Sequence, residues 1–345
     1  MRTRLMTSMV TALLLAVTAA CSSPAARPAG RPAGAGASSG LKGQTAPAGC
    51  GRATETVATA AQLAHALASA RPGTAIGLSP GVYRGDFVAN VSGTASAAIT
   101  LCGGRTAVLQ GRSVSSGYTI HLQHASYWRL EGFTVVGGQK GVVTDGSSYD
   151  VIEGLYVHGT GDEAIHLRSF SSHDVVNRNV IRDAGLDKPS FGEGIYVGSA
   201  HSNWCRYSGC NPDASNDNVI TNNNISNTTA ENIDIKEGTR GGTIVGNRLD
   251  GAGMVASAAT AWINVKGNDW KILDNAGVNS PGDGYQVHQV YPGWGIANTF
   301  LGNKATLTGS GVGIYVQSHH LQTIVGCNNA VSGAELSNVP CAPAD

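Results

Sequence analysis

A five-residue pattern recurs eight times between Thr119 and Gln317, and it constrains the fold more than any other feature of the sequence. Its second place is always apolar, and its fourth place is apolar in every copy except the second. This alternation predicts strands that bury one face. The copies are Thr119–Gln123, Gly141–Asp145, Ala164–Arg168, Gly194–Gly198, Asn232–Lys236, Trp262–Lys266, Gly284–His288 and Gly313–Gln317.

Successive copies begin 22, 23, 30, 38, 30, 22 and 29 residues apart. A second short apolar run lies between copies and leads into Asn or Gly, as in Val175–Asn179. Coils of this length with two or three short strands predict an all-β solenoid, a single-stranded parallel β-helix. The recurrent asparagines predict a structural ladder at one turn, because Asn tolerates left-handed backbone and its amide can bond neighbouring coils. They are Asn179, Asn223, Asn247, Asn275 and Asn303.

Composition agrees with such a chain and excludes other classes. Glycine supplies 47 of the 345 residues, while charged residues make up only 13%. A solenoid needs glycine at its turns and few charges in its stacked interior. Lys plus Arg and Asp plus Glu are 23 each, which excludes a basic nucleic-acid-binding protein.

The N-terminus predicts export. Residues 1–21 carry Arg2 and Arg4 before a short apolar run, which is typical of a signal peptide. Its end resembles a bacterial lipobox, so Cys21 would carry a lipid anchor, the chain's one attachment to a membrane. The alternative is an ordinary signal peptide cleaved nearby. Residues 22–48 then form a Pro/Ala/Gly/Ser-rich linker and residues 49–345 the β-helix domain, which makes the protein an exported cell-surface lipoprotein or a secreted protein.

Six further cysteines suggest disulfides, as expected in an exported chain. We predict the pairs Cys50–Cys102, Cys205–Cys210 and Cys327–Cys341, because each would staple one region. We expect the protein to be a monomer.

The N-terminal part of the domain carries a family resemblance. Val57–Ala70 reads as a helix with Leu63 and Leu67 on one face, which would cap the solenoid. This helix, the segment PGTAIGLSPGVY and the strands ITLCGG and AVLQG resemble the first coils of pectate-lyase-like right-handed β-helix proteins. Within that superfamily the chain is similar to chondroitinase B and related alginate lyases, over about residues 55–340.

The solenoid pattern also predicts where the chemistry lies. Places one, three and five of each copy are expected to face outward. The middle places form the column His121, Val143, His166, Tyr196, Asp234, Asn264, Gln286 and Tyr315. The fifth places form the column Gln123, Asp145, Arg168, Gly198, Lys236, Lys266, His288 and Gln317. The scarce charges gather here beside aromatic residues, as a sugar-binding groove requires.

The resemblance implies β-elimination of a uronic-acid polysaccharide, an acidic partner. Lys236 lies in a stretch similar to the lysine base motif of chondroitinase B-like lyases, and Lys266 nearby is expected to lower its pKa. Arg168 or His166 would neutralise the substrate carboxylate or donate a proton, with Asp234 in the same catalytic cluster. Substrate-binding residues are predicted to be Tyr196, Trp262, Asn232, Asn264, His288 and Gln286.

Three further interpretations concern carboxylates and the class of protein. Ca²⁺, which prefers several oxygen ligands, is predicted at Glu193, Glu231, Glu163 and Asp283, with Asp234 beside them. A glycoside hydrolase or transglycosylase is the alternative enzyme, with Asp234 paired to Glu193 or Glu231. A lipoprotein that binds polysaccharide without catalysis is the alternative outside enzymes.

Overall fold

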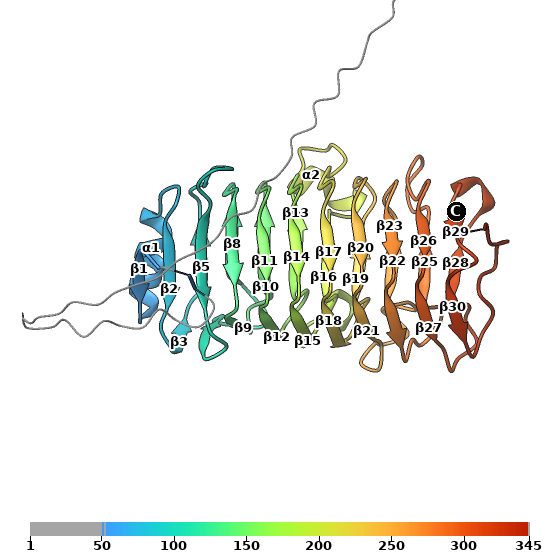
Figure 1. Ribbon diagram of the computed structural model, residues 1–345, viewed down its shortest axis with the longest axis horizontal. Coiled ribbons are helices and arrows are strands. Elements are labelled where there is room, and N and C mark those ends of the chain that lie inside the picture. The colour runs from blue at the N-terminus through green and yellow to red at the C-terminus, as the bar shows by residue number, and fades with distance from the viewer. Residues whose placement is uncertain (1–49, 52, 344–345) are drawn as a thin grey trace, which may run out of the picture. The chain divides into compact units, whose positions relative to one another are not determined.

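The computed structural model describes residues 50–51 and 53–343, and nearly all regular structure in that range is β. Short parallel strands stack coil upon coil from the N-terminal to the C-terminal end of the domain (Figure 1). The predicted all-β parallel β-helix is therefore confirmed. The predicted signal peptide and linker, with Cys21, lie outside the described residues.

The strands form three parallel sheets, one for each side of the coil. Sheet A contains β1 Glu55–Val57, β2 Ala75–Leu78, β5 Ile99–Gly103, β8 Trp128–Glu131, β11 Val151–Glu153, β14 Val175–Asn177, β17 Val219–Thr221, β20 Thr243–Val245, β23 Lys271–Leu273, β26 Thr299–Leu301 and β29 Ile324–Val325. Sheet B contains β3 Gly81–Arg84, β6 Ala107–Gln110, β9 Thr134–Val136, β12 Tyr156–Thr160, β15 Val180–Ala184, β18 Asn224–Thr228, β21 Arg248–Asp250, β24 Ala276–Val278, β27 Lys304–Thr306 and β30 Ala330–Ser332. Sheet C contains β4 Phe87–Ala89, β7 Tyr118–Gln123, β10 Lys140–Asp145, β13 Ile165–Arg168, β16 Ile195–Val197, β19 Ile233–Ile235, β22 Ile263–Val265, β25 Tyr285–Val287 and β28 Ile314–Val316.

Sheet C is built from the eight repeat copies, preceded by β4. Its register aligns the middle places of the copies in the predicted order, from His121 through His166, Tyr196 and Asp234 to Tyr315. Residues at the second place, such as Ile165 and Ile233, are fully buried in the core. The period of two thus places the middle column on the outer face of one sheet.

The first place of the repeat does not face outward, which corrects two predicted substrate-binding residues. Trp262 is fully buried in the core, and Asn232 is buried with its amide donating to Thr228 and to the carbonyl of Asp250. The first place lies where the chain turns into sheet C, so a side chain there meets the next coil. At Gly194 a Cβ would lie 2.6 Å from the carbonyl oxygen of Asn232, which explains glycine in that copy.

An asparagine ladder runs through the coils, as predicted. In each rung the side-chain oxygen of one Asn accepts from the backbone N–H of the Asn in the preceding coil, at 2.8 to 3.0 Å. The side-chain amide donates to a backbone carbonyl, as Asn223 does to Val176. These bonds satisfy polar groups inside the turn, which would otherwise destabilise the fold.

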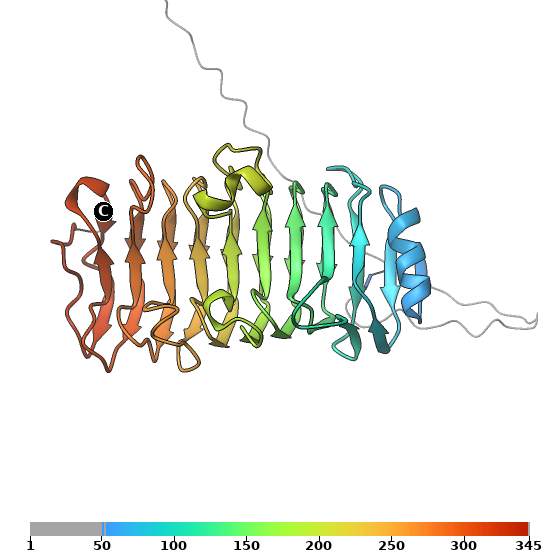
Figure 2. The same cartoon turned by 180° about the vertical axis from the view of Figure 1, so that it is seen from behind.

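The ends of the domain are closed and stapled. Helix α1 (Ala60–Ser69) covers the first coils and buries Leu63, Ala66 and Leu67, so the predicted cap is confirmed (Figure 2). The three predicted disulfides, Cys50–Cys102, Cys205–Cys210 and Cys327–Cys341, are all present. The remaining helices are α2 (Trp204–Tyr207) and three 3₁₀ turns, Pro189–Phe191, His201–Asn203 and His319–Leu321. Among the described residues, no helix is both long enough and apolar enough to cross a membrane.

Candidate functional site

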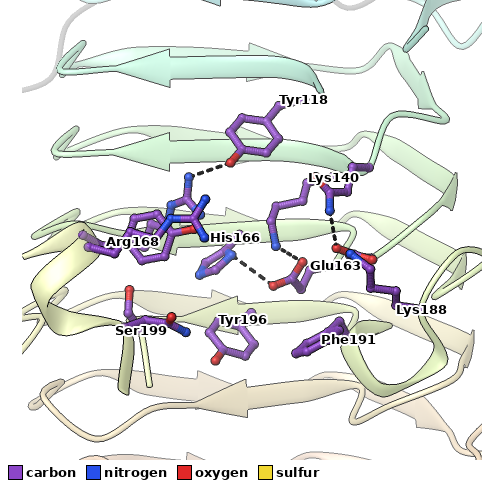
Figure 3. A pocket seen from close by; sticks show the side chains of 14 residues that line it. Tyr118, Lys140, Glu163, His166, Arg168, Lys188, Phe191, Tyr196 and Ser199 are labelled. Carbon is purple, nitrogen blue, oxygen red and sulfur yellow. Dashed lines mark hydrogen bonds and ion pairs between the residues drawn. The ribbon is translucent and has the colours of Figure 1, made fainter. Parts of the chain in front are cut away.

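A pocket of about 290 Å³ opens on the outer face of sheet C, over β7, β10, β13 and β16 (Figure 3). Four cationic side chains line it, Lys140, Arg168, Lys188 and Arg206, against two carboxylates, Asp162 and Glu163. The other lining residues are Tyr118, Gln139, His166, Phe191, Tyr196, Ser199, Asn203 and Tyr207. An excess of cations beside aromatic rings suits a sugar that carries negative charge.

Arg168 is the most firmly held cation of the pocket. Its Nε and Nη2 donate to the two carboxylate oxygens of Asp145 at 2.6 and 3.0 Å, and Nη2 also donates to the Tyr118 hydroxyl at 2.9 Å. The ring of Tyr207 lies 4.1 Å from the guanidinium carbon. Burial alone would lower the pKa of Arg168, but Asp145 outweighs it and raises the pKa, so the guanidinium stays charged.

His166 and Glu163 form a second group in the pocket wall. Glu163 pairs with Lys140, and its Oε1 lies 3.3 Å from Nδ1 of His166. The other ring nitrogen of His166 lies 2.9 Å from the carbonyl oxygen of Gly198 and donates to it. Burial lowers the pKa of His166, although Glu163 opposes this effect, and Nδ1 is buried without a hydrogen-bond partner among the described residues. Both of its nitrogens face protein atoms, which suits a positioning role better than proton transfer.

Tyr196 follows His166 in the middle column, with the two rings 4.4 Å apart. It lines the pocket, and its hydroxyl has no hydrogen-bond partner among residues 53–343. Burial raises the pKa of the phenol well above its usual value, although Lys236 opposes this effect. Tyr196 is therefore a protonated group that a ligand in the pocket can reach.

Lys236 lies beside the pocket, with its ammonium nitrogen 4.9 Å from the centre of the Tyr196 ring and 15% of its side chain exposed. Asp234 joins it to Lys266, at 2.7 Å from Lys236 Nζ and 2.5 Å from Lys266 Nζ. Burial alone would lower the pKa of Lys236, but Asp234 raises it well above its usual value. The expected lowering by Lys266 is therefore wrong, because the carboxylate between the two ammonium groups dominates.

Three buried carboxylates from the coils of β16 and β19 lie close together. Glu193, Glu231 and Asp234 each offer an oxygen within 4.8 Å of the others. Burial, followed by the charges of Glu163, Asp234 and Glu231, raises the pKa of Glu193 well above its usual value. The pKa of Asp234 is lowered, because its two lysines outweigh burial.

This carboxylate cluster does not fit Ca²⁺. Both oxygens of Asp234 are bound to lysines, and Oε1 of Glu231 accepts a hydrogen bond from Asn264, so three of the six carboxylate oxygens of the cluster are already engaged, while Glu193 Oε2 is buried without a partner in the described part of the chain. Ca²⁺ needs six to eight oxygens. The two other predicted ligands are engaged elsewhere. Glu163 pairs with Lys140, and Asp283 accepts from Gln286 and from the N–H of Val312.

The remaining predicted substrate-binding residues lie on the same face, beyond the pocket. Asn264 and Gln286 continue the middle column, and His288 lies 2.9 Å from the side-chain oxygen of Asn264. The structure thus brings Arg168, His166 and Tyr196 into one pocket with Lys236, Asp234 and Lys266 beside it. The roles of Asn264, Gln286 and His288 stay predictions.

Two insertions supply lining residues that the sequence did not reveal. Lys188 and Phe191 come from the loop after β15, and Asn203, Arg206 and Tyr207 come from the loop after β16. Two sequence signals pointed to these loops: the spacings of 30 and 38 residues between copies, and the cysteine pair Cys205–Cys210, which brackets Arg206 and Tyr207.

The second loop is anchored under the pocket by a buried carboxylate. Asp213 accepts from the backbone N–H groups of Ser169 and Phe170 and from the hydroxyls of Ser199 and Ser215, at 2.6 to 2.9 Å. Trp204 packs inward and donates to the carbonyl of Ser199. The loop therefore holds Tyr207 against Arg168 as a fixed wall.

Comparison with solved structures identifies proteins that resemble this chain. An alginate lyase from Paenibacillus sp. str. FPU-7 is 34% identical, with a TM-score of 0.77 over 83% of this chain and 98% of that one. Pectate lyase Pel9A is 15% identical, with a TM-score of 0.59 over 85% of this chain and 82% of that one. The periplasmic alginate epimerase AlgG is 13% identical, with a TM-score of 0.55 over 76% of this chain and 60% of that one. No family model and no curated protein matches the sequence.

Proposed function

The chain belongs to the family of parallel β-helix polysaccharide lyases that includes the Paenibacillus alginate lyase, and from this we propose that it cleaves a uronic-acid polysaccharide by β-elimination outside the cell. The observation that carries the proposal is the cation-rich pocket beside the protonated pair Tyr196 and Lys236. Three disulfides support an exported protein, because they persist in oxidising surroundings.

β-Elimination removes the proton at C5 of a uronate, next to its carboxylate, and expels the oxygen at C4. Negative charge develops on the carboxylate as the proton leaves, so a fixed cation there lowers the barrier. Arg168 suits this role because Asp145 and Tyr118 fix its guanidinium in the pocket wall. Lys140, Lys188 and Arg206 provide further positive charge for neighbouring uronates.

Two proton transfers remain, and Lys236 and Tyr196 lie where they could perform them. We assign Lys236 as the base that takes the C5 proton and Tyr196 as the acid that protonates the leaving oxygen. The phenol starts the reaction protonated, as an acid must. The amine must first lose a proton, and its raised pKa means that the active form grows as pH rises. Activity should therefore increase into the alkaline range.

Hydrolysis by paired carboxylates receives less support. Asp234 and Glu193 lie close together, but both oxygens of Asp234 are bound to lysines. A glycosidase needs two carboxyl groups that flank the scissile bond. Asp234 cannot act on a sugar without breaking those ion pairs.

The proposal is tested by the cleavage of alginate and of other acidic polysaccharides, followed through the ultraviolet absorbance of the unsaturated uronate. Lys236→Arg is the sharpest variant, because it can keep the ion pair with Asp234 but cannot act as a base. We expect its rate to fall about 10²- to 10⁴-fold. Lys304→Arg, at an exposed position on sheet B, is the matched control and should keep full activity. Near-normal activity in Lys236→Arg would refute the base assignment.

Exchange in D₂O separates the two roles. If Lys236 is the base, Tyr196→Phe should stop cleavage yet let the intact polymer gain deuterium at C5, whereas Lys236→Arg should gain none. The opposite pattern would assign the base to Tyr196. Circular dichroism of both variants establishes that the solenoid is intact before the exchange is interpreted.

A further inference from the structure

Sheet B carries a second groove, on a different face of the coil from the pocket. It has a volume of about 710 Å³ and crosses β6, β9, β12 and β15. The lining residues are Arg105, Val108, Thr134, Val136, Tyr156, His158, Val180 and Arg182. Three of these eight are valines and two, Tyr156 and His158, carry aromatic rings, and none is acidic.

The register of sheet B shows how this surface arises. Val82, Val108, Thr134, Tyr156 and Val180 align across five successive coils. The next two positions of the same column are Asn224 and Arg248, so the apolar stripe ends at β15. Strands stack about 4.8 Å apart, and five coils therefore give a stripe of about 19 Å, the length of several sugar rings. An extended apolar stripe confined to one half of a solenoid marks a binding surface.

Charge and aromatic residues define what this groove can bind. The rings of Tyr156 and His158 stack 4.3 Å apart, and Arg105 lies 5.8 Å from the centre of the Tyr156 ring. Arg105 and Arg182 are exposed on its borders. The neighbouring Asp183 accepts a hydrogen bond from Asn227, outside the groove lining. The groove therefore offers an apolar floor between cationic borders.

We propose that this groove is a second binding site for an acidic polysaccharide, separate from the pocket on sheet C. Aromatic and aliphatic side chains pack on the apolar faces of sugar rings, and arginine binds carboxylates through two parallel hydrogen bonds. The proposal rests on the proposed function, since it assigns the groove a further stretch of the same kind of polymer. A polymer held at two sites dissociates more slowly than one held at the pocket alone.

Two other occupants fit the charges poorly. Residues 22–48 contain Arg27, Arg31 and Lys42 and no acidic residue, so the arginines of the groove repel this segment. In a dimer with two-fold symmetry, the groove of one copy would face the groove of the other. Arg105 and Arg182 of the two copies would then meet and repel each other. A polyanion neutralises these arginines in a way that neither occupant does.

Binding is measured by electrophoresis through gels that contain alginate, in the Lys236→Arg background so that the polymer stays intact. Arg105→Glu/Arg182→Glu should weaken retardation roughly tenfold, because two solvent-exposed ion pairs with the polymer are lost. The matched control is Arg248→Glu/Lys304→Glu, which makes the same charge change in the C-terminal half of sheet B and should retain full retardation. Unchanged retardation in the first variant, or an equal loss in the control, would overturn the proposal.

Two further readouts separate the groove from the pocket. Tyr156→Ala in the wild-type background should raise KM for long polymer and leave kcat/KM for a trisaccharide unchanged, because a trisaccharide occupies the pocket alone. Gels containing dextran, a neutral polymer, should retard no variant, and equal retardation by dextran would contradict the acidic ligand. The gel measurement does not need cleavage, so failure of the lyase proposal and failure of this one are distinguishable.

Discussion

Replacing Asp174 by Asn should stabilise the solenoid, and the gain should grow with pH. Asp150 and Asp174 occupy neighbouring rungs of a buried turn, where each accepts a backbone N–H through Oδ1, from Trp128 and Asp150 respectively. Their Oδ2 atoms are buried without a partner. Burial raises the pKa of both carboxyls well above the usual value, and for Asp174 the charge of Asp150 adds to it. The next rung holds Asn218, whose amide donates to two backbone carbonyls.

The size of the effect follows from proton linkage. A carboxyl that stays protonated in the fold and ionises in the unfolded chain costs about 1.4 kcal/mol per pH unit above its ordinary pKa. Because the folded pKa is raised, the stability is fully present below that ordinary pKa and is lost as pH rises toward the folded value. Asn cannot ionise, so Asp174→Asn should gain stability relative to wild type as pH rises above the ordinary pKa of the carboxyl, by on the order of 1 kcal/mol for each pH unit over which the buried wild-type carboxyl stays protonated.

Urea unfolding followed by circular dichroism at several pH values measures this gain. The urea concentration at the midpoint of unfolding should fall as pH rises in the wild-type protein. This fall should be smaller in Asp174→Asn and smallest in the double variant that also carries Asp150→Asn. Asn218→Asp is the converse control, since it extends the run of carboxyls and should steepen the fall. Equal pH slopes in wild type and Asp174→Asn would refute the reasoning.

Two further predictions concern the pocket. Cys205→Ser/Cys210→Ser should raise KM several-fold with little change in kcat, because the loop that holds Tyr207 against Arg168 loses its disulfide. A fall in kcat as large as the rise in KM would instead place the loop in the chemical step. Chelation with EDTA should leave the rate unchanged and added Ca²⁺ should not shift the melting temperature, because lysines already bind both oxygens of Asp234. A rate that collapses in EDTA and recovers with Ca²⁺ would contradict this account.

The repeat predicted most of the fold because stacking in a solenoid is periodic. His121 and Asp234 occupy the middle place of their repeat copies, so the repeat predicts that the middle places of the copies between them align on successive strands. The structure has this register. The asparagine ladder follows for the same reason. The periodicity fails at the corner, where Trp262 turns into the core instead of out. A strand's alternation says nothing about the residue at which the chain bends.

The site was predicted in part, and the reasons differ between residues. Arg168, His166 and Tyr196 lie on strands of sheet C, so the repeat located them. Lys188 and Arg206 lie in insertions outside the repeat, whose paths depend on contacts that no spacing records. The electrostatics of Lys236 also escaped prediction. The sequence shows two lysines one rung apart, but only the structure shows Asp234 bound between them.

The central claim is β-elimination in the pocket on sheet C, and one measurement tests it most directly. Alginate is digested with the wild-type protein, and new reducing ends and unsaturated uronates are counted in the same sample. Elimination forms one unsaturated uronate for each bond cleaved, so the two counts should rise together in equal amounts. Reducing ends that appear without the unsaturated product would contradict the account and show hydrolysis instead.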